Sequence, residues 1–578
     1  MNKIIMLVTV LAVFFCGRSL ADPLEITITI PRTASDLATS TYSYDVIGID
    51  TPVETSNGVN IVQNGPPGQS SSLFIRGTES DHSLITLNGI AIKDHSTPSG
   101  ADDFSQHNLI GIDYLTVIKG PMSNAHGPNA AGGVIDMHSS TYGNSYIDVS
   151  IGSNNLISKE ISVVDKDQTD RHNFKVTANQ TTTDGVSVYA QGEEKDPHEA
   201  NTFNIGYDYI GNKYILKLNK IKDKNNMSLD SGSADVLNYT GDWEWNNNQI
   251  DFQTKNTRVV LNNSKHDRSY TKNSVVDTYN SESNTYLTQH TFNKDTYDYS
   301  VGWEYNEASA DFATNINSYQ SSVNENRYVT GLFFEVDKEY YLGNILSFSS
   351  RYDSISDFDS KLSSRIGISF DHLRASYSQG YRLPTLYEMY GIDSYGYNGN
   401  PNLNAEDIDS YEVGYKSGNF DTALFYIEET NSITYANSTY TNITGGGTSK
   451  GAEVSYSKDY NGYIFDSNVT YTEAKLNNGD EKLRRPAWTN SSSISKNIDD
   501  LNYKASMNYY GDHKDIDSST FKTINKSSIT TFDLELNQTH ENKMFYLGLY
   551  NITDEKYEQP DGYNQMGINF QTGIRIVM

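Results

Sequence analysis

Residues 61–77 read IVQNGPPGQSSSLFIRG, and they indicate how the first part of the chain is organised. An uncharged run of Asn, Gly, Pro, Gln and Ser leads directly into a short apolar stretch that ends in Ile75, Arg76 and Gly77. Gly and Pro favour turns, whereas a short apolar run of this length is typical of a strand. The stretch therefore predicts a polar loop followed by a strand with an arginine at its end.

Further motifs follow residue 77 in a fixed order. They read LITLNG (84–89), IKGP (118–121) and HGPNAAGGVI (126–135). Together with residues 61–77, this series resembles the plug domain of the TonB-dependent outer-membrane receptors, and it is most similar to the vitamin B12 transporters. The resemblance implies an α+β plug domain, which we place at residues 33–140, inside the lumen of a transmembrane β-barrel.

The N-terminus predicts export from the cytoplasm. Residues 1–21 combine Lys3, an apolar run and a Ser-Leu-Ala cleavage site, as a signal peptide does. Cys16, the single cysteine, would be removed with it, and Val13 to Phe15 lack the small residues that precede a lipidated cysteine. The mature chain then has no disulfide, no cysteine metal site and no thiol nucleophile.

Residues 141–578 alternate apolar and polar side chains with a period of two, as in Ile568, Phe570, Thr572, Ile574 and Ile576. No apolar run after the signal peptide reaches the roughly 18 residues of a membrane helix. Only a closed barrel satisfies every backbone group in lipid when no helix is available. We therefore predict an all-β transmembrane barrel, and the family resemblance implies about 22 antiparallel strands.

The alternative to a membrane barrel is a secreted all-β protein, and composition and further motifs favour the barrel. The chain has 43 Tyr against 21 Phe and 4 Trp, which suits the aromatic girdles of a membrane barrel. The last residue, Met578, departs from the aromatic residue that usually ends such barrels. Six further stretches resemble barrel motifs of the same family, in the same order: 381–390, 399–406, 410–414, 450–453, 483–486 and 551–557.

Residues 22–32 contain a short alternating segment between Pro23 and Pro31. Such a segment is able to add as a strand to the sheet edge of another protein. It lies where the family has its TonB box, so the resemblance implies binding to the energy-coupling protein TonB; the alternative is a first strand of the plug. The residues assigned to TonB binding are Leu24, Glu25, Ile26, Thr27, Ile28 and Thr29.

Two basic residues, Arg76 and Lys119, resemble the basic positions of the plug motifs. We expect them to anchor the plug by pairing with carboxylates of the barrel rather than to bind substrate. Lys119 stands where the family usually has arginine, which would replace a bidentate contact by a point charge. His126 and Asn88 also depart from the family pattern, which usually has tyrosine and aspartate there.

Two plug loops are predicted to face outward and to contact the substrate, and neither contains Arg or Lys. Ferric siderophores are commonly anionic and call for cationic side chains, whereas cobalamin is nearly neutral and rich in amides. We therefore expect transport of cobalamin or a related corrinoid; the alternatives are a ferric siderophore or haem, and a passive pore or adhesin. The candidate residues are Gln63, Asn64, Gly65, Gln69, Ser70, Ser96, Thr97 and Ser99.

The chain is acidic, with a net charge of −29, or −31 once Lys3 and Arg18 leave with the signal peptide. This charge disfavours nucleic acid and suits a divalent cation. Calcium is the candidate cofactor, because the cobalamin receptors bind it in roughly this region; the alternative is solvated or lipopolysaccharide-associated carboxylates. The candidate ligands are Asp184, Asp196, Glu199, Asp230 and Asp235.

We find no catalytic constellation in the sequence and therefore predict a protein that is not an enzyme. The expected location is the outer membrane of a Gram-negative bacterium, as a monomer in contact with lipopolysaccharide. Its expected partners are TonB and the small-molecule substrate.

Overall fold

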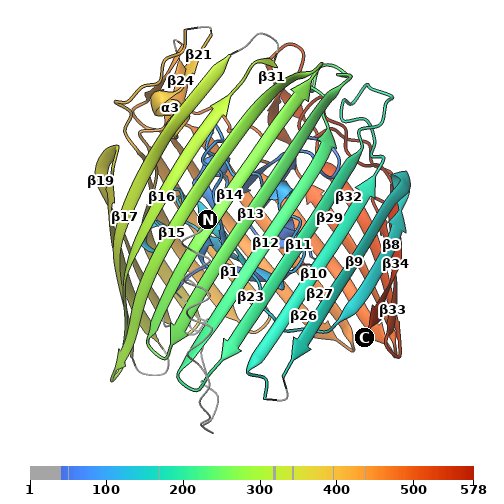
Figure 1. The fold of residues 1–578 in the computed structure, drawn as a ribbon, viewed down its shortest axis with the longest axis horizontal. Helices are drawn as coiled ribbons and strands as arrows, with labels where there is room; N and C mark the ends of the chain where they lie inside the picture. Colours follow the sequence, from blue (N-terminus) through green and yellow to red (C-terminus); the bar gives the residue numbers. More distant parts are fainter. Residues whose placement is uncertain are drawn as a thin grey trace, which may run out of the picture.

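The computed structural model describes residues 41–49, 51–167, 169–316, 320–340, 344–394, 396–436 and 438–578. A closed barrel surrounds a smaller N-terminal body (Figure 1). The signal peptide and the TonB-box segment predicted at residues 1–32 lie outside the described residues. No helix in the described part of the chain has the length and apolar character needed to cross a membrane.

The barrel wall consists of 22 antiparallel strands, which confirms the predicted fold class. It closes where β34 pairs with β8, through contacts such as Gly573 with Ser150. A further two-residue strand, β21 (Ile392–Asp393), pairs with β17. The 22 strands are β8 (Tyr146–Gly152), β9 (Leu156–Lys166), β10 (His172–Thr183), β11 (His198–Ile210), β12 (Tyr214–Ser228), β13 (Tyr239–Thr254), β14 (Thr257–Lys272), β15 (Val275–Lys294), β16 (Tyr297–Ala313), β17 (Ser321–Glu339), β18 (Ile345–Ile355), β19 (Phe358–Phe370), β20 (Leu373–Arg382), β22 (Glu406–Ser417), β23 (Phe420–Thr430), β26 (Gly447–Tyr460), β27 (Tyr463–Leu476), β28 (Trp488–Ile498), β29 (Leu501–Tyr510), β32 (Ile529–His540), β33 (Lys543–Tyr550) and β34 (Asn569–Val577).

The two ends of the barrel differ in their connections. At one end, called the turn end here, links such as 211–213, 255–256 and 541–542 join neighbouring strands. The other end, called the loop end, carries longer links such as 383–405 and 511–528. Figure 1 shows these links at the top, with the C-terminus near the bottom. They contain α3 (Leu386–Tyr390), β24 (Ile433–Ala436), β25 (Thr439–Asn442), β30 (His513–Ile516) and β31 (Thr523–Lys526).

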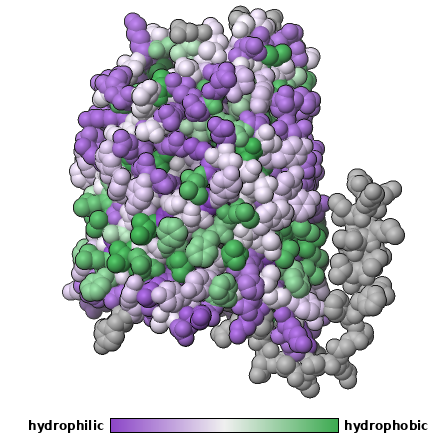
Figure 2. Space-filling model, turned by 90° about the vertical axis from the view of Figure 1, so that its left-hand side faces the viewer, coloured by the Kyte–Doolittle hydropathy of each residue, from purple (hydrophilic) through white to green (hydrophobic). Residues whose placement is uncertain are grey.

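The outer surface of the wall is apolar where a membrane would contact it. Outward side chains such as Leu332, Ile366 and Leu424 are exposed. The residues that alternate with them along each strand face the lumen. Figure 2 shows the hydrophobic residues gathered in a band across the lower half of the molecule. This arrangement matches the alternation predicted from the sequence, since lipid-facing and lumen-facing residues alternate along each strand.

The plug domain is built on a five-stranded sheet in the order β1 (Tyr44–Gly48), β6 (Tyr114–Lys119), β7 (Gly133–His138), β4 (Ser83–Leu87) and β5 (Ile90–Ala91). A separate hairpin pairs β2 (Val59–Gln63) with β3 (Ser71–Ile75). Among the described residues, the helical parts of the plug are the short helix α2 (Ser123–His126) and single 3-10 turns such as η3 (Ser80–His82). The other 3-10 turns in the described part of the chain are η2 (Val53–Thr55), η4 (Phe104–Gln106) and, in the barrel, η5 (Ser153–Asn155).

The plug shares its hydrophobic core with the barrel wall. Plug residues such as Leu73 and Ile135 belong to one buried cluster with Ile221, Trp243 and Trp245 of β12 and β13. These wall side chains point into the lumen and complete the core. The plug is therefore packed against the barrel rather than suspended inside it.

Arg76 fastens the plug to the wall by two buried ion pairs. Its Nη1 lies 2.7 Å from Oε2 of Glu412, and its Nη2 lies 2.8 Å from Oε2 of Glu453. Its guanidinium also lies 4.8 Å from the centre of the Phe425 ring. Lys119 contacts Asp45 of the plug at 2.8 Å and Glu453 at 3.9 Å, so it joins the same cluster mainly through a plug carboxylate.

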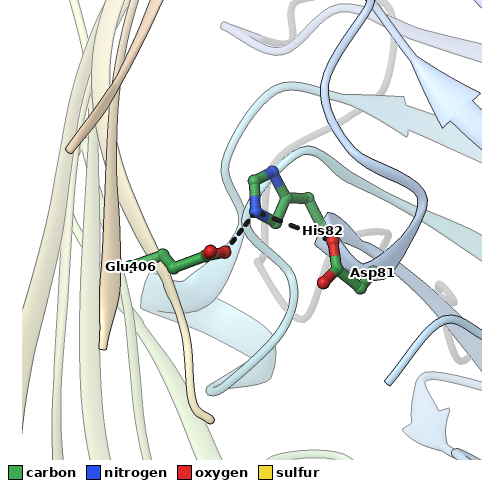
Figure 3. Close-up of side chains that lie close together, drawn as sticks. All are labelled: Asp81, His82 and Glu406. Atoms are coloured by element: carbon green, nitrogen blue, oxygen red, sulfur yellow. Dashed lines mark hydrogen bonds and ion pairs between the residues drawn. The ribbon is translucent and has the colours of Figure 1, made fainter. Parts of the chain in front are cut away.

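A second buried cluster joins η3 to the wall (Figure 3). Nε2 of His82 lies 2.7 Å from Oε2 of Glu406 and 3.8 Å from Oδ1 of Asp81. Burial by itself lowers the pKa of His82, but the hydrogen bond to Glu406 and the charge of Asp81 outweigh it and raise this pKa to about 9. Arg382 also contacts both carboxylates, at 3.1 and 2.7 Å, and a third one, Glu388, at 3.0 Å.

The first prediction concerns Arg76. Arg76→Ala leaves Glu453 and Glu412 buried without their main cation, and such a loss costs about 3–5 kcal/mol of stability. We expect the plug to unfold at lower urea concentration, measured by a fluorescent label on the plug of the otherwise folded barrel. Arg171→Ala at the turn end, where Arg171 contacts Asn212, is the matched control. An unchanged midpoint for Arg76→Ala would show that the buried pairs do not hold the plug.

The second prediction concerns the pH dependence of the same unfolding. Since the pKa of His82 is raised from 6.5 to about 9 in the folded protein, its contribution is complete below pH 6.5 and is lost as the pH rises through 9. The size of the effect is about 3 kcal/mol. The urea midpoint of the plug should fall over this range, and His82→Gln should remove that part of the fall. Equal pH profiles for both proteins would contradict the assignment.

Candidate substrate and metal site at the loop end

Five of the predicted substrate residues lie at the last position of β2, which is Gln63, and in the loop that joins β2 to β3. Gln63 and Asn64 donate to the carbonyl of Pro66 and to the Ser70 hydroxyl, at 2.9 and 3.1 Å. The turn depends on Gly65, whose φ of 125° is unfavourable for other residues. Gln69 is buried and donates to the carbonyl of Ser228 at 2.7 Å, so its amide is used to attach the loop to the wall. Ser70 is exposed.

The second predicted loop contains Ser96, Thr97 and Ser99. The Ser96 hydroxyl is fully buried and donates to Asp94 at 2.6 Å. Thr97 donates to the Asp94 carbonyl at 3.0 Å, whereas Ser99 is exposed. The structure therefore leaves Thr97 and Ser99 available at the surface of this loop and uses Ser96 inside it.

The two loops meet at one small cavity of about 70 Å³, which we call the loop cavity. Ser70 and Thr97 both line it. The lining also includes four carboxylates and a single guanidinium: Asp94, Asp102, Asp103, Asp242 and Arg268. The structure thus brings together residues from both predicted loops, and it adds charged residues that the loop sequences do not contain.

Arg268 is the cation of the loop cavity, and it is already paired. Its Nε lies 2.8 Å from Oδ2 of Asp94, and its Nη2 donates to Ser96 at 3.1 Å. Burial raises the pKa of Asp102 to about 6, although the nearby charge of Lys93 opposes this rise. The cavity is therefore acidic. Sequence reasoning missed Arg268 because it lies on β14, far along the chain, with no motif around it.

A cluster of carboxylates lies in two loops beside this region. Carboxylate oxygens of Glu194, Asp196 and Asp230 lie within 4.8 Å of one another. A hydrogen bond with Asp235 and partial burial raise the pKa of Glu194 to about 7. Burial and the charge of Asp230 raise the pKa of Asp196 to about 6. Three of the five predicted calcium residues are thus brought together, with Glu194, which sequence reasoning missed.

The other two predicted residues stand apart from this cluster. Asp184 pairs with Lys195 at 3.1 Å, and both side chains are exposed. Glu199 lies on β11 and accepts from Asn201 and Gln180. The spacing along the chain did not reveal this difference, because the loop reverses direction between residues 184 and 196.

The carboxylate cluster is attached to the plug loop through the barrel loops. The Val188 amide donates to Asp196 at 2.8 Å, and the Tyr189 amide donates to Asp230 at 3.0 Å. Gly65 of the plug packs close to the Val188 side chain. A ligand that orders these carboxylates therefore also orders the barrel loop that contacts the plug loop.

The donor set of the cluster fits calcium. It offers carboxylate oxygens alone, which are hard ligands of the kind that calcium prefers. Among the described residues, no salt bridge links Glu194, Asp196, Asp230 or Asp235 to Lys or Arg. The raised pKa values of Glu194 and Asp196 express this uncompensated repulsion, which a bound divalent cation would relieve.

Two family models match the chain. One, "TonB dependent receptor-like, beta-barrel", covers residues 94–552, and the other, "TonB-dependent Receptor Plug Domain", covers residues 49–134. The vitamin B12 transporter BtuB of Vibrio cholerae is 24% identical over 557 residues, which cover 88% of this chain and 86% of the relative.

Solved structures agree on the fold. The siderophore receptor PirA from Acinetobacter baumannii has a TM-score of 0.77 and 15% identity, covering 94% of this chain and 100% of that chain. A mutant of the ferric enterobactin receptor PfeA from Pseudomonas aeruginosa has a TM-score of 0.76 and 16% identity, covering 93% and 98%. With a family model that matches most of its length, the chain belongs to the TonB-dependent receptors, a family of transport proteins of the Gram-negative outer membrane.

Proposed function

We propose that this receptor imports cobalamin or a related corrinoid across the outer membrane. The observation that carries the proposal is the charge of the loop cavity, which has four carboxylates and one guanidinium that is already paired. An anionic ferric siderophore would meet repulsion there, because unpaired cationic side chains are the groups that bind such ligands. A nearly neutral ligand rich in amides can donate hydrogen bonds to these oxygens instead.

The loop residues support the same ligand class. Thr97 and Ser99, with Asn64 and Ser70, present hydroxyl and amide groups, which exchange hydrogen bonds with amides. The relative that is a vitamin B12 transporter supports this choice at the level of sequence. Because the structural relatives include siderophore receptors, an iron complex is the competing candidate for the substrate.

Transport further requires a source of energy. A nutrient held at nanomolar affinity is bound by about 12 kcal/mol and leaves slowly. The outer membrane itself offers no ATP, so we assign the coupling to TonB through residues 24–29, which would add as a strand to its sheet.

The third prediction tests the substrate. The membrane-extracted protein should bind cyanocobalamin at nanomolar concentration in an equilibrium titration with calcium present, and ferric enterobactin should not compete. Asp102→Lys and Asp103→Lys together should weaken cyanocobalamin binding at least tenfold. The matched control is Asp480→Lys with Glu481→Lys in an exposed loop, which should leave it unchanged. Tight binding of ferric enterobactin with no binding of cyanocobalamin would replace the corrinoid by an iron complex.

The coupling assignment is tested in cells with the same substrate. Ile26→Pro removes a backbone donor and fixes φ within the alternating segment. We expect it to abolish uptake while leaving binding intact. Uptake equal to that of the unchanged protein would contradict the role of residues 24–29.

The fourth prediction concerns calcium, which we propose binds Glu194, Asp196 and Asp230. Glu194→Gln should weaken calcium binding at least tenfold in a calorimetric titration. Asp184→Asn removes one charge from the same loop but from a carboxylate paired with Lys195, and it should have little effect. Affinity should fall as the pH drops through 7 and 6, because Glu194 and Asp196 then take up protons. Equal affinities for both variants would reduce the cluster to solvated loop carboxylates.

A further inference from the structure

The loop cavity is lined by buried side chains whose polar atoms have no hydrogen-bond partner within the protein. These atoms are Oδ2 of Asp102, Oε1 of Gln106, Nδ1 of His107 and Nδ1 of His266. Each of the four residues is at most 8% exposed. Buried polar atoms normally have a partner, so four of them around one cavity indicate a group that is bound there.

Two of these atoms are acceptors because of the bonds that their side chains already make. Nε2 of His266 lies 2.7 Å from the Ile92 carbonyl, which can only accept, so Nε2 carries the proton of the neutral ring and Nδ1 presents a lone pair. Nε2 of Gln106 donates to the Gly68 carbonyl at 3.2 Å, which leaves Oε1 as the acceptor. With the carboxylate oxygen of Asp102, the cavity therefore offers acceptors that call for a donor.

The charge of the loop cavity favours the same kind of group. Its lining has four carboxylates and one guanidinium, and that guanidinium, of Arg268, pairs with Asp94 at 2.8 Å. Three carboxylates of the lining remain after this pair. They repel a second carboxylate and attract the positive end of an N–H bond.

The spacing of the ligand atoms does not suit a bare metal ion. In the described part of the chain, two clusters have three histidine or carboxylate atoms within 4.8 Å of one another, and neither contains a residue of the loop cavity. An NH₂ group, by contrast, reaches two acceptors about 5 Å apart through hydrogen bonds of about 2.9 Å. The acceptors of the cavity therefore suit the separated hydrogens of such a group.

The size of the loop cavity limits the group to a few heavy atoms. Its volume is about 70 Å³, whereas a single water molecule needs about 10–15 Å³ of such space. Ile92 and Trp243 offer apolar contact to the carbon atoms of a short arm. The exposed Ser70 also lines the cavity, and its hydroxyl accepts from Asn64 at 3.1 Å, so its proton is available to a carbonyl.

We propose that the loop cavity is the subsite for a terminal N–H donor arm of the ligand. The nitrogen of the arm donates to Nδ1 of His266 and Oε1 of Gln106, and Asp102 rejects an arm that ends in a carboxylate. In the corrinoid of the proposed function, on which this assignment rests, the arm is a primary carboxamide whose carbonyl accepts from Ser70. A ligand of another class would bring a primary ammonium group instead.

The first experiment compares each amide of the corrinoid with its acid. The monocarboxylic acids of cyanocobalamin, in each of which one side-chain amide is hydrolysed, compete against labelled cyanocobalamin on the membrane-extracted protein with calcium present. We expect one acid to bind at least tenfold more weakly than cyanocobalamin and the others within threefold, because a single arm enters the cavity. Binding of every acid within threefold of cyanocobalamin would overturn the subsite and leave the proposed substrate standing.

A conservative variant assigns the discrimination to the cavity. Asp102→Asn keeps the shape of the side chain and removes its charge. For the sensitive arm, the ratio of the dissociation constants of acid and amide should fall at least fivefold in this variant. Asp480→Asn removes the same charge from an exposed loop and should keep the ratio within twofold. An equal ratio in Asp102→Asn and the unchanged protein would place the discrimination outside the loop cavity.

The second experiment uses no corrinoid. Propionamide, propylammonium and propionate are titrated into the unchanged protein and into Asp102→Asn, and binding is followed by tryptophan fluorescence, since Trp243 lines the cavity. Propionamide should bind the unchanged protein at least fivefold more tightly than propionate does, and this difference should shrink in Asp102→Asn.

The fragments separate the subsite from the proposed substrate. If the unchanged protein does not bind cyanocobalamin, the proposed substrate is wrong. Preference for propionamide or propylammonium over propionate, reduced in Asp102→Asn, would then still support the subsite, and the tighter of the two would tell an amide arm from an amine arm. Equal binding of all three fragments, or no binding of any, would overturn the subsite in that case.

Discussion

The width of the barrel is the constraint on which the rest of the structure depends. A closed sheet of 22 strands has a lumen that side chains cannot fill, and an unfilled lumen would leave a permanent hole in the outer membrane. The plug supplies the missing volume. It takes part of its core from the wall, as Trp243 and Trp245 show. The lumen therefore decides both the presence of the plug and its dependence on the barrel.

The buried charges of the interface follow from the same constraint. The inner face of a membrane barrel is polar, so a plug that packs against it must bury polar and charged groups. Buried ion pairs contribute little net stability compared with apolar packing, but breaking one is costly. Arg76 and His82 each pair with a carboxylate of the wall. Both pairs form together only when the plug has one particular position inside the barrel. Such pairs specify how the plug sits more than how tightly it folds.

Much of the fold could be predicted from local patterns, because strand alternation and turn chemistry are local properties. The site could be predicted only in part. Arg268 contacts Ser96 of the plug and Glu406 contacts His82, and these partners are more than 170 and 320 positions apart in the sequence. No local pattern reveals such contacts. Glu194 was missed and Glu199 was included for the same reason: the course of the loop after β10, rather than the spacing of its acidic residues, decides which carboxylates converge. The segment at residues 24–29 lies outside the described residues and remains a prediction.

Both sides of the plug sheet are held to the wall by buried charged groups. Near β1, charged groups are buried and mutually paired, so moving them exposes unpaired charge in a confined space. On the β5 side, Arg268 of β14 pairs with the buried Asp94 at 2.8 Å and donates to Ser96 at 3.1 Å. Moving either side therefore leaves a buried charge without its partner, which is costly. The polar lumen thus fixes the plug at both edges of its sheet.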